Sequence, residues 1–179
     1  LRIVSCSNLI PLKRVHLLAE ALRHVAGPVH WTHFGDGPER PRVEALIAGL
    51  PACIHVDLRG SVPNAEVMAW YKANPVDVLV HGSESEGLPV ALMEATSFGI
   101  PLIAADAGGV REITTAETGI LLPHAITPEM LAETLNGFKT SGWYDAEARS
   151  RVRAFWASRF NAKEVYARLL EELAGRNHA

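Results

Sequence analysis

The sequence predicts an α/β domain built on an open, doubly wound parallel sheet of about six strands. Strand-like apolar runs alternate with helical periodicity almost without exception along the 179 residues. The two central runs, residues 76–80 and 101–105, are nearly continuous in apolar residues. Such runs are typical of strands that helices cover on both faces. We therefore expect residues 1–179 to form one Rossmann-like domain.

Each element is predicted from its own local pattern. Strands are expected where apolar and β-branched residues stand between turn residues, at 1–6, 29–34, 53–58, 76–80, 101–105 and 119–122. Helices are expected where apolar residues recur every three to four positions, at 15–25, 39–50, 65–73, 89–98, 110–114, 128–139, 146–157 and 162–174. Asn64 is expected to cap the helix that starts at residue 65. Residues 175–179 are expected to fray.

Composition excludes several classes of protein. A formal charge of −3 argues against a general binder of nucleic acid or anionic membranes. No apolar run approaches the roughly 20 residues that span a bilayer. Cys6 and Cys53 lie in apolar runs without CxxC spacing, so we expect buried free thiols in a reducing compartment. The start inside a strand, without Met or a signal-peptide pattern, indicates a domain of a longer protein.

Metal ligands are not evident in the sequence. The eight histidines show no HxxxH or HxH spacing, and no Asp-x-Asp occurs. A metal-bound diphosphate is therefore not expected. His81 ends one of the central strands, which leaves a supporting role open for it.

The segment 83–95, SESEGLPVALMEA, links the central strand to the helix that follows it. Glu86 and Glu94 stand on either side of that helix start, whose free N–H groups and positive dipole end can bind an anion. The acids would repel an anion but suit neutral hydroxyls, and the combination describes a sugar nucleotide. As structural alternatives, Glu86 is a partner of the helix dipole and Glu94 points to solvent.

Five loops are expected to share one crevice, because ligands of such sheets bind outside the carboxyl ends of the strands. These loops span 7–14, 35–38, 59–64, 82–88 and 106–111. Lys13 and Arg14 lie at the start of the first helix, where cations oppose the dipole. Their position suits phosphate neutralisation, and solvated surface is the alternative. The glycine turn at 35–38 is open to a purely structural role.

Four segments carry a resemblance to a known family. They are SNLIPLKR at 7–14, GDGPER at 35–40, the Glu-x7-Glu motif from Glu86 to Glu94, and ADAGGVREI at 105–113 with GILL at 119–122. Together they resemble the C-terminal, donor-binding domain of retaining glycosyltransferases of the GT-B fold, family 4, over nearly the whole chain. The resemblance implies transfer of a sugar from a nucleoside-diphosphate sugar to a glycan or lipid-linked acceptor, in cell-surface polysaccharide or glycolipid assembly. It implies neither a cofactor nor a metal.

The resemblance also implies a role for individual residues. Glu86 is the expected catalytic residue, contacting hydroxyls of the donor sugar and helping to stabilise the oxocarbenium-like transition state. Glu94 accepts hydrogen bonds from the ribose hydroxyls, and Lys13 binds the diphosphate. The diphosphate also meets the backbone at Gly87, Leu88, Pro89 and Val90.

Two positions depart from the family pattern. Asn8 stands where many members carry Arg, and Arg14 replaces the glycine that often follows the lysine. We expect Arg14 to supply part of the missing charge. Residues 60–62, including Val62, are expected beside the nucleobase through backbone contacts.

The acceptor-binding domain of such enzymes is not represented in these residues. The chain alone is expected to bind donor weakly without transferring sugar, and the full-length enzyme to be cytoplasmic or at the inner face of the membrane. The closing helices, about 146–174, resemble the segment that packs toward the missing domain. Their aromatic surface is expected to favour self-association where it is exposed; the relevant residues are Trp143, Trp156, Phe160 and Tyr166. The alternatives are another GT-B enzyme, such as an epimerase or phosphorylase, and a non-catalytic nucleotide-binding module.

Overall fold

A computed structural model describes the chain over residues 1–176, and the side chains over 1–167 and 169–171. Its six strands form one sheet in the order β3-β2-β1-β4-β5-β6, and all neighbours run parallel. The strands are β1 Arg2–Cys6, β2 Val29–Phe34, β3 Ile54–Leu58, β4 Val78–His81, β5 Leu102–Ala105 and β6 Gly119–Leu122. The predicted fold class is confirmed.

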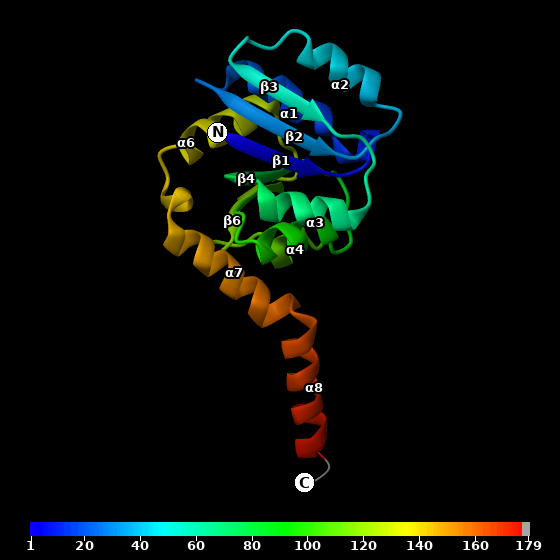
Figure 1. Ribbon diagram of the computed structural model, residues 1–179, viewed down its shortest axis with the longest axis vertical. Coiled ribbons are helices and arrows are strands. Elements are labelled where there is room, and N and C mark those ends of the chain that lie inside the picture. Colours follow the sequence, from blue (N-terminus) through cyan, green and yellow to red (C-terminus); the bar gives the residue numbers. More distant parts are fainter. Residues whose placement is uncertain (177–179) are drawn as a thin grey trace.

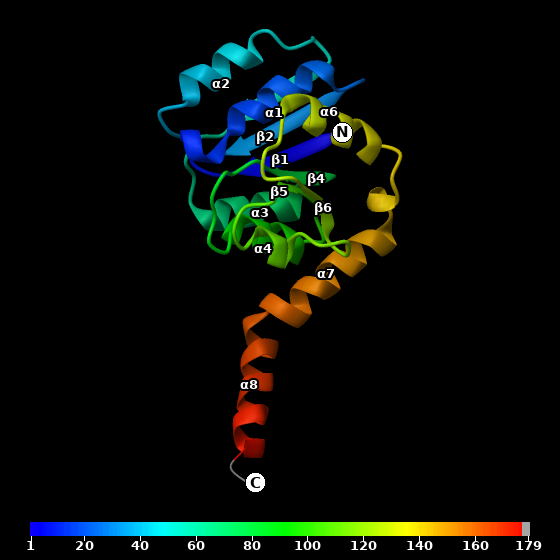
Figure 2. The ribbon, with the colours of Figure 1, turned by 180° about the vertical axis from the view of Figure 1, so that it is seen from behind.

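The helices cover both faces of this sheet. They are α1 Val15–Ala21, α2 Arg40–Ile47, α3 Asn64–Ala73, α4 Val90–Ser97, α5 Val110–Ile113, α6 Pro128–Phe138, α7 Ala146–Phe160 and α8 Ala162–Arg176, with 3-10 turns η1 Pro11–Lys13, η2 Leu22–His24 and η3 Gly142–Tyr144. Figure 1 shows α3 and α4 on one face, and Figure 2 shows α1 and α6 on the other. Successive residues of β1 alternate between the two layers, because Ile3 packs into the α1–α6 core and Val4 into the α3–α4 core.

The sheet reverses its winding between β1 and β4. These strands pair directly, with Ile3 opposite Val78, although β2 and β3 intervene in sequence. The chain therefore leaves β1 and β4 toward opposite faces of the sheet, which opens a crevice at their carboxyl ends. This crevice is where the loops named above are gathered.

Several local predictions are corrected. Asn64 does not cap α3: it is the first helical residue, Pro63 holds the cap position, and no side chain caps this end. Cys53 is exposed and precedes β3 rather than lying buried within it, whereas Cys6 is half-buried, and both are free thiols. The loop after β1 contains the turn η1, since Pro11 suits the start of a helical turn.

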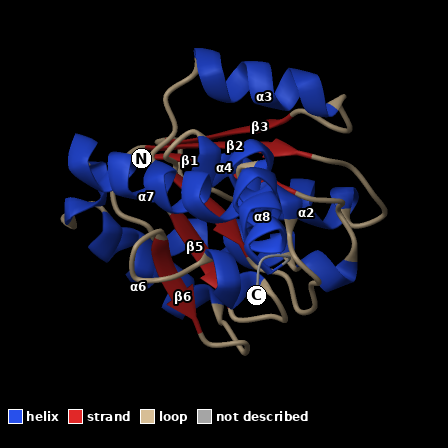
Figure 3. Ribbon diagram, turned by 90° about the horizontal axis from the view of Figure 1, so that it is seen from below, coloured by secondary structure: helices blue, strands red, loops and turns tan. Residues whose placement is uncertain are grey.

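The end of the chain differs from the rest. Helix α7 packs on α4 and extends to Phe160, while α8 projects away from the sheet (Figure 1). In Figure 3, seen from below, the strands fan out from β3 to β6 and α8 is viewed nearly end-on. Helix α8 continues through Arg176, and the remainder of the stretch expected to fray, 177–179, lies outside the described residues. No helix among the described residues is long and apolar enough to cross a membrane.

Candidate functional site

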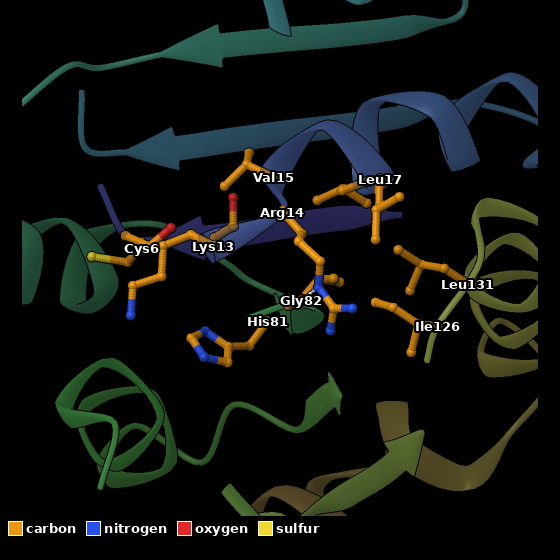
Figure 4. A pocket seen from close by; sticks show the side chains of 13 residues that line it. Cys6, Lys13, Arg14, Val15, Leu17, His81, Gly82, Ile126 and Leu131 are labelled. Atoms are coloured by element: carbon orange, nitrogen blue, oxygen red, sulfur yellow. Dashed lines mark hydrogen bonds between the residues drawn. The ribbon is translucent and has the colours of Figure 1, made fainter. Parts of the chain in front are cut away.

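The carboxyl ends of β1 and β4 open onto a groove made of two adjoining hollows. One lies between the start of α1 and the end of β4, and Lys13 and His81 reach into it (Figure 4). The other lies between β1, β2 and the loop after β3, and it includes Asn8 and Val62. Cys6 lines both hollows. The two hollows therefore adjoin at the carboxyl end of β1, and we refer to the pair as the groove.

Glycines hold the loop that carries Glu86 against its neighbour. A Cβ placed on Gly108, whose φ is +53°, would lie 2.0 Å from the carbonyl oxygen of Glu86. A Cβ on Gly109 would lie 2.3 Å from the carbonyl oxygen of Gly87, which accepts a 2.9 Å hydrogen bond from the Gly109 amide. Only glycine permits this approach of two backbones. The loop after β5 thus supports the loop after β4.

Glu86 is the centre of a cluster of three side chains. Its Oε1 accepts hydrogen bonds from the amine of Lys13 at 2.6 Å and from Nε2 of His81 at 2.9 Å. The Glu86 side chain is 11% exposed, and that of His81 is 6% exposed. Lys13 is the last residue of turn η1, and His81 is the last residue of β4. The switch between β1 and β4 thus brings a cation, an imidazole and a carboxylate together.

The environment of Glu86 keeps its carboxyl charged. Burial alone would raise the pKa of Glu86, but the hydrogen bonds from His81 and Lys13 outweigh it and lower this pKa to about 2. A carboxyl with this pKa is ionised at neutral pH and is a poor proton donor. It can accept hydrogen bonds from hydroxyls and stabilise a nearby positive charge.

The start of α4 supplies backbone donors beside this cluster. Pro89 holds the cap position, and no side chain caps this helix end. The amide of Leu92 is the first to turn back, onto the carbonyl of Pro89. The amides of the first helical residues therefore lack partners within the helix. Leu88 and Val90 are 43% and 59% exposed, so this end of α4 is open to an anion.

Glu94 has different neighbours from Glu86. Its Oε1 accepts a 2.6 Å hydrogen bond from the side-chain amide of Asn64, at the start of α3. It also lies near Cys6: burial raises the pKa of that thiol to about 11, and the charge of Glu94 adds to the effect. Glu94 is therefore half-buried, is held by Asn64 and lies near Cys6, and it does not simply point to solvent.

Arg14 is committed to backbone contacts. Its Nε donates to the carbonyl of Gly82 at 2.7 Å, and its Nη2 donates to those of Ser83 and His124 at 3.1 and 3.0 Å. The guanidinium therefore ties the loop after β4 to the loop after β6. Arg14 also has a left-handed backbone, with φ 47°. Glycine adopts this conformation readily, which gives a physical reason for the glycine that often follows the lysine in similar sequences.

The structure places eight of the ten predicted site residues in three sets, while Arg14 and Glu94 have the separate contacts described above. Lys13 lies with Glu86, the four residues 87–90 lie at the start of α4, and Asn8 lies with Val62 in the second hollow. Two partners of these residues were not among the predicted site residues. His81 could be found only as a strand end on the crevice, and Asn64 was assigned to capping because Asn is a preferred cap.

Two further expectations concern metals and aromatic surface. Among the side chains that the structure describes, those of residues 1–167 and 169–171, no three from His, Cys, Asp or Glu converge in a way that could hold a metal ion. Of the four aromatic residues expected on the closing helices, Tyr166 is 65% exposed. The other three are half-buried, so the exposed aromatic surface of these four residues lies mainly at Tyr166.

Comparisons with known proteins agree on one class. Residues 1–154 match the family described as "Glycosyl transferases group 1". The chain is 40% identical over 79 residues to sulfoquinovosyl transferase SQD2 of Arabidopsis thaliana, a match that covers 44% of this chain and 14% of that protein. It is 36% identical over 99 residues to a GDP-mannose-dependent alpha-mannosyltransferase of Mycobacterium tuberculosis, covering 55% of this chain and 24% of that protein.

A solved structure supports the fold. HepE of Anabaena, crystallised in complex with UDP and glucose, superimposes with a TM-score of 0.77 at 24% identity, covering 97% of this chain and 48% of that one. The α/β fold with its six-stranded parallel sheet thus matches that of GT-B glycosyltransferases. The chain spans less than a quarter of the length of the two relatives and about half of HepE.

Proposed function

Because the chain belongs to the group 1 glycosyl transferases, we propose that it is the donor-binding part of a retaining enzyme of family 4. The donor is a sugar activated as a nucleoside diphosphate. The single observation that carries this proposal is the set of groups beside the two hollows: Lys13 paired with Glu86, the uncapped start of α4, and Glu94 held by Asn64. The nucleotides named for relatives, GDP-mannose for the mannosyltransferase and UDP for HepE, support the same class of donor.

The donor is proposed to lie along the groove with its base beside Val62 and Asn8. Its ribose hydroxyls donate to Glu94, and its diphosphate meets Lys13 and the backbone of residues 87–90. Arg14 assists through its charge while it holds the neighbouring loops. Amides and a lysine neutralise the diphosphate here, and this supports binding without a metal ion or cofactor.

Glu86 is proposed as the catalytic residue, and Lys13 and His81 hold it in place. Its ionised carboxylate accepts hydrogen bonds from hydroxyls of the donor sugar. In the transition state the sugar carbon gains positive charge as the bond to the diphosphate breaks, and the fixed negative charge of Glu86 stabilises it. The pKa of about 2 supports this role because the carboxylate stays charged throughout the reaction.

The acceptor is proposed to bind a second domain outside these 179 residues, with α8 reaching toward it. The acceptor is a glycan or lipid-linked saccharide of cell-surface polysaccharide or glycolipid assembly, and the full-length enzyme is cytoplasmic or at the inner face of the membrane. On this proposal the isolated chain binds donor weakly and does not transfer sugar.

Calorimetric titration of the chain with UDP, GDP and ADP tests the proposal. We expect one nucleotide to bind with EDTA present as well as it does with Mg²⁺, and Glu94→Ala to weaken that binding. A folded chain that binds none of them is the result expected of a non-catalytic module, and it would overturn the proposal. For the full-length enzyme, NMR of the product from UDP-, GDP- and ADP-sugars reads the anomeric configuration. A product with inverted anomeric configuration would contradict the retaining mechanism. Robust transfer by the 179-residue chain would contradict the proposal that a second domain is needed to bind the acceptor.

A further inference from the structure

The side chain of Asn64 contacts Glu94 and leaves its own helix uncapped. Asn64 is the first residue of α3, and its amide donates to Oε1 of Glu94 at 2.6 Å across 30 positions of sequence. Asparagine at a helix start ordinarily bonds to the backbone of the first turn. Here the side-chain amide connects α3 to α4, so it holds Glu94 and does not cap its own helix.

The face of α3 that carries Asn64 continues with Val67 and Tyr71. Val67 follows Asn64 by one turn and lines the hollow that holds Asn8. Tyr71 follows by two turns and is 5% exposed, and its hydroxyl is buried without a hydrogen-bond partner among the described residues. Burial raises the pKa of that hydroxyl, and the charge of Glu94 raises it further. Glu94 thus contacts the start of α3 through Asn64, and its charge also acts on Tyr71 two turns further along.

We propose that Asn64 is a positioning residue that fixes the carboxylate of Glu94 and thereby sets a preference for ribose over deoxyribose in the nucleotide. The inference rests on the proposed function, which gives Glu94 the ribose. Glu94 has two carboxylate oxygens, and the Asn64 amide occupies part of one. The carboxylate is then oriented before the nucleotide arrives, so less freedom is lost when hydroxyls bind to it.

Asn64 contributes a hydrogen-bond donor to Glu94 in addition to the space that its side chain fills. An amide donor to a carboxylate forms a charge-assisted hydrogen bond. Alanine removes the donor. Aspartate keeps the shape of asparagine and replaces the donor by a like charge, which repels Glu94. The two substitutions therefore separate the donor from the space that it fills.

Titration with matched pairs of nucleotides tests the proposal. The probes are UDP with 2′-deoxy-UDP and 3′-deoxy-UDP, or the GDP series if GDP binds more tightly. We expect Asn64→Ala to weaken UDP binding by roughly three- to tenfold, which corresponds to the loss of one hydrogen bond. Asn64→Asp should weaken it more. The affinity of Asn64→Ala for at least one deoxy analogue should differ little from that of the wild type. The ratio of the affinities for UDP and for that analogue should therefore be smaller in Asn64→Ala than in the wild type. Glu66→Gln, on the exposed side of the same first turn, is the control and should bind as the wild type does.

A double-mutant cycle completes the test. Because Asn64 acts through Glu94, adding Asn64→Ala to Glu94→Ala should cause no further loss. Equal losses for UDP and for both deoxy analogues would indicate a merely structural role and overturn the inference. If Glu94→Ala weakens UDP binding and Asn64→Ala does not, the inference fails and the proposed function stands. If the folded wild type binds none of UDP, GDP and ADP, the inference and the proposed function fail together.

Discussion

The amine of Lys13 lies 2.6 Å from Oε1 of Glu86, although the two residues are 73 positions apart in the chain. The pair joins the loop after β1 to the loop after β4 across the point where the sheet reverses its winding. In the free protein the cation of the groove is therefore held by an internal carboxylate, which a diphosphate must share or replace. The pair also makes stability depend on the charge of Glu86.

The first prediction concerns stability at acid pH. The pKa of Glu86 is about 2 in the folded protein and is ordinarily 4.5, so the folded state favours the charged form. This contribution is complete above about pH 4.5 and is lost as the pH falls toward 2. We expect Glu86→Gln to be about 1 kcal/mol less stable than the wild type at pH 7, allowing for solvent screening, and the gap to shrink by pH 3. Urea unfolding at the two pH values measures it. Glu84→Gln is the exposed control, and a constant gap for Glu86→Gln would contradict the prediction.

The second prediction concerns the charge of Lys13. If the lysine meets the diphosphate, Lys13→Met should weaken UDP or GDP binding by roughly tenfold or more, as expected for a charge-assisted hydrogen bond. Binding of the corresponding nucleoside, which lacks phosphate, should change little. Competition titrations measure both ligands on the same protein samples. An equal loss for nucleotide and nucleoside would show that Lys13 acts by holding Glu86 and not by contacting phosphate.

The third prediction separates the two properties of Arg14. Its three hydrogen bonds to backbone carbonyls favour the folded state, whereas its left-handed backbone opposes it. We expect Arg14→Ala to lower the free energy of unfolding by about 1–3 kcal/mol, because the variant loses the three hydrogen bonds and keeps the strained backbone. The free energy of unfolding of Arg14→Gly should fall by about 1 kcal/mol less than that of Arg14→Ala, because glycine adopts a left-handed backbone readily. Thermal and urea unfolding of both variants give the difference.

The same variants test what Arg14 contributes to the ligand. If Arg14→Ala leaves nucleotide affinity unchanged while Lys13→Ala weakens it, the proposed contribution of the Arg14 charge is refuted. Equal stability of the alanine and glycine variants would instead refute the argument from strain.

The fold was predictable because each part of the pattern is local. Alternating strand and helix patterns need only neighbouring residues, and the apolar runs at 76–80 and 101–105 marked strands covered on both faces. The sequence also marked the loops of the crevice, because a parallel sheet places all strand ends on one edge. Element boundaries were less accurate: α7 runs to Phe160, three residues beyond its predicted end.

The contacts within the site were not predictable in the same way. Each requires the distance between segments that are far apart in sequence, as for Lys13 with Glu86 and Asn64 with Glu94. Asn64 shows why local rules fail here. Its position satisfied a preference for helix capping, and a tertiary contact with a carboxylate took the amide instead. Cys53 shows the same limit for burial, since its apolar neighbours did not reveal that it lies exposed just before β3.

The fourth prediction concerns the loop that supports Glu86. An alanine Cβ at Gly108 would lie 2.0 Å from the Glu86 carbonyl oxygen, and the residue has a positive φ. The loop after β4 or the loop after β5 must therefore move. We expect Gly108→Ala to lower the free energy of unfolding by about 2 kcal/mol or more and to weaken nucleotide binding. The matched control is Gly137→Ala, where nothing lies within 4 Å of the new Cβ and the site is helical. Alanine there should stabilise by about 0.5–1 kcal/mol without changing nucleotide affinity. Unfolding curves and calorimetric titrations of the two variants give both quantities. A Gly108→Ala protein with unaltered affinity would show that the position of Glu86 does not depend on the loop after β5.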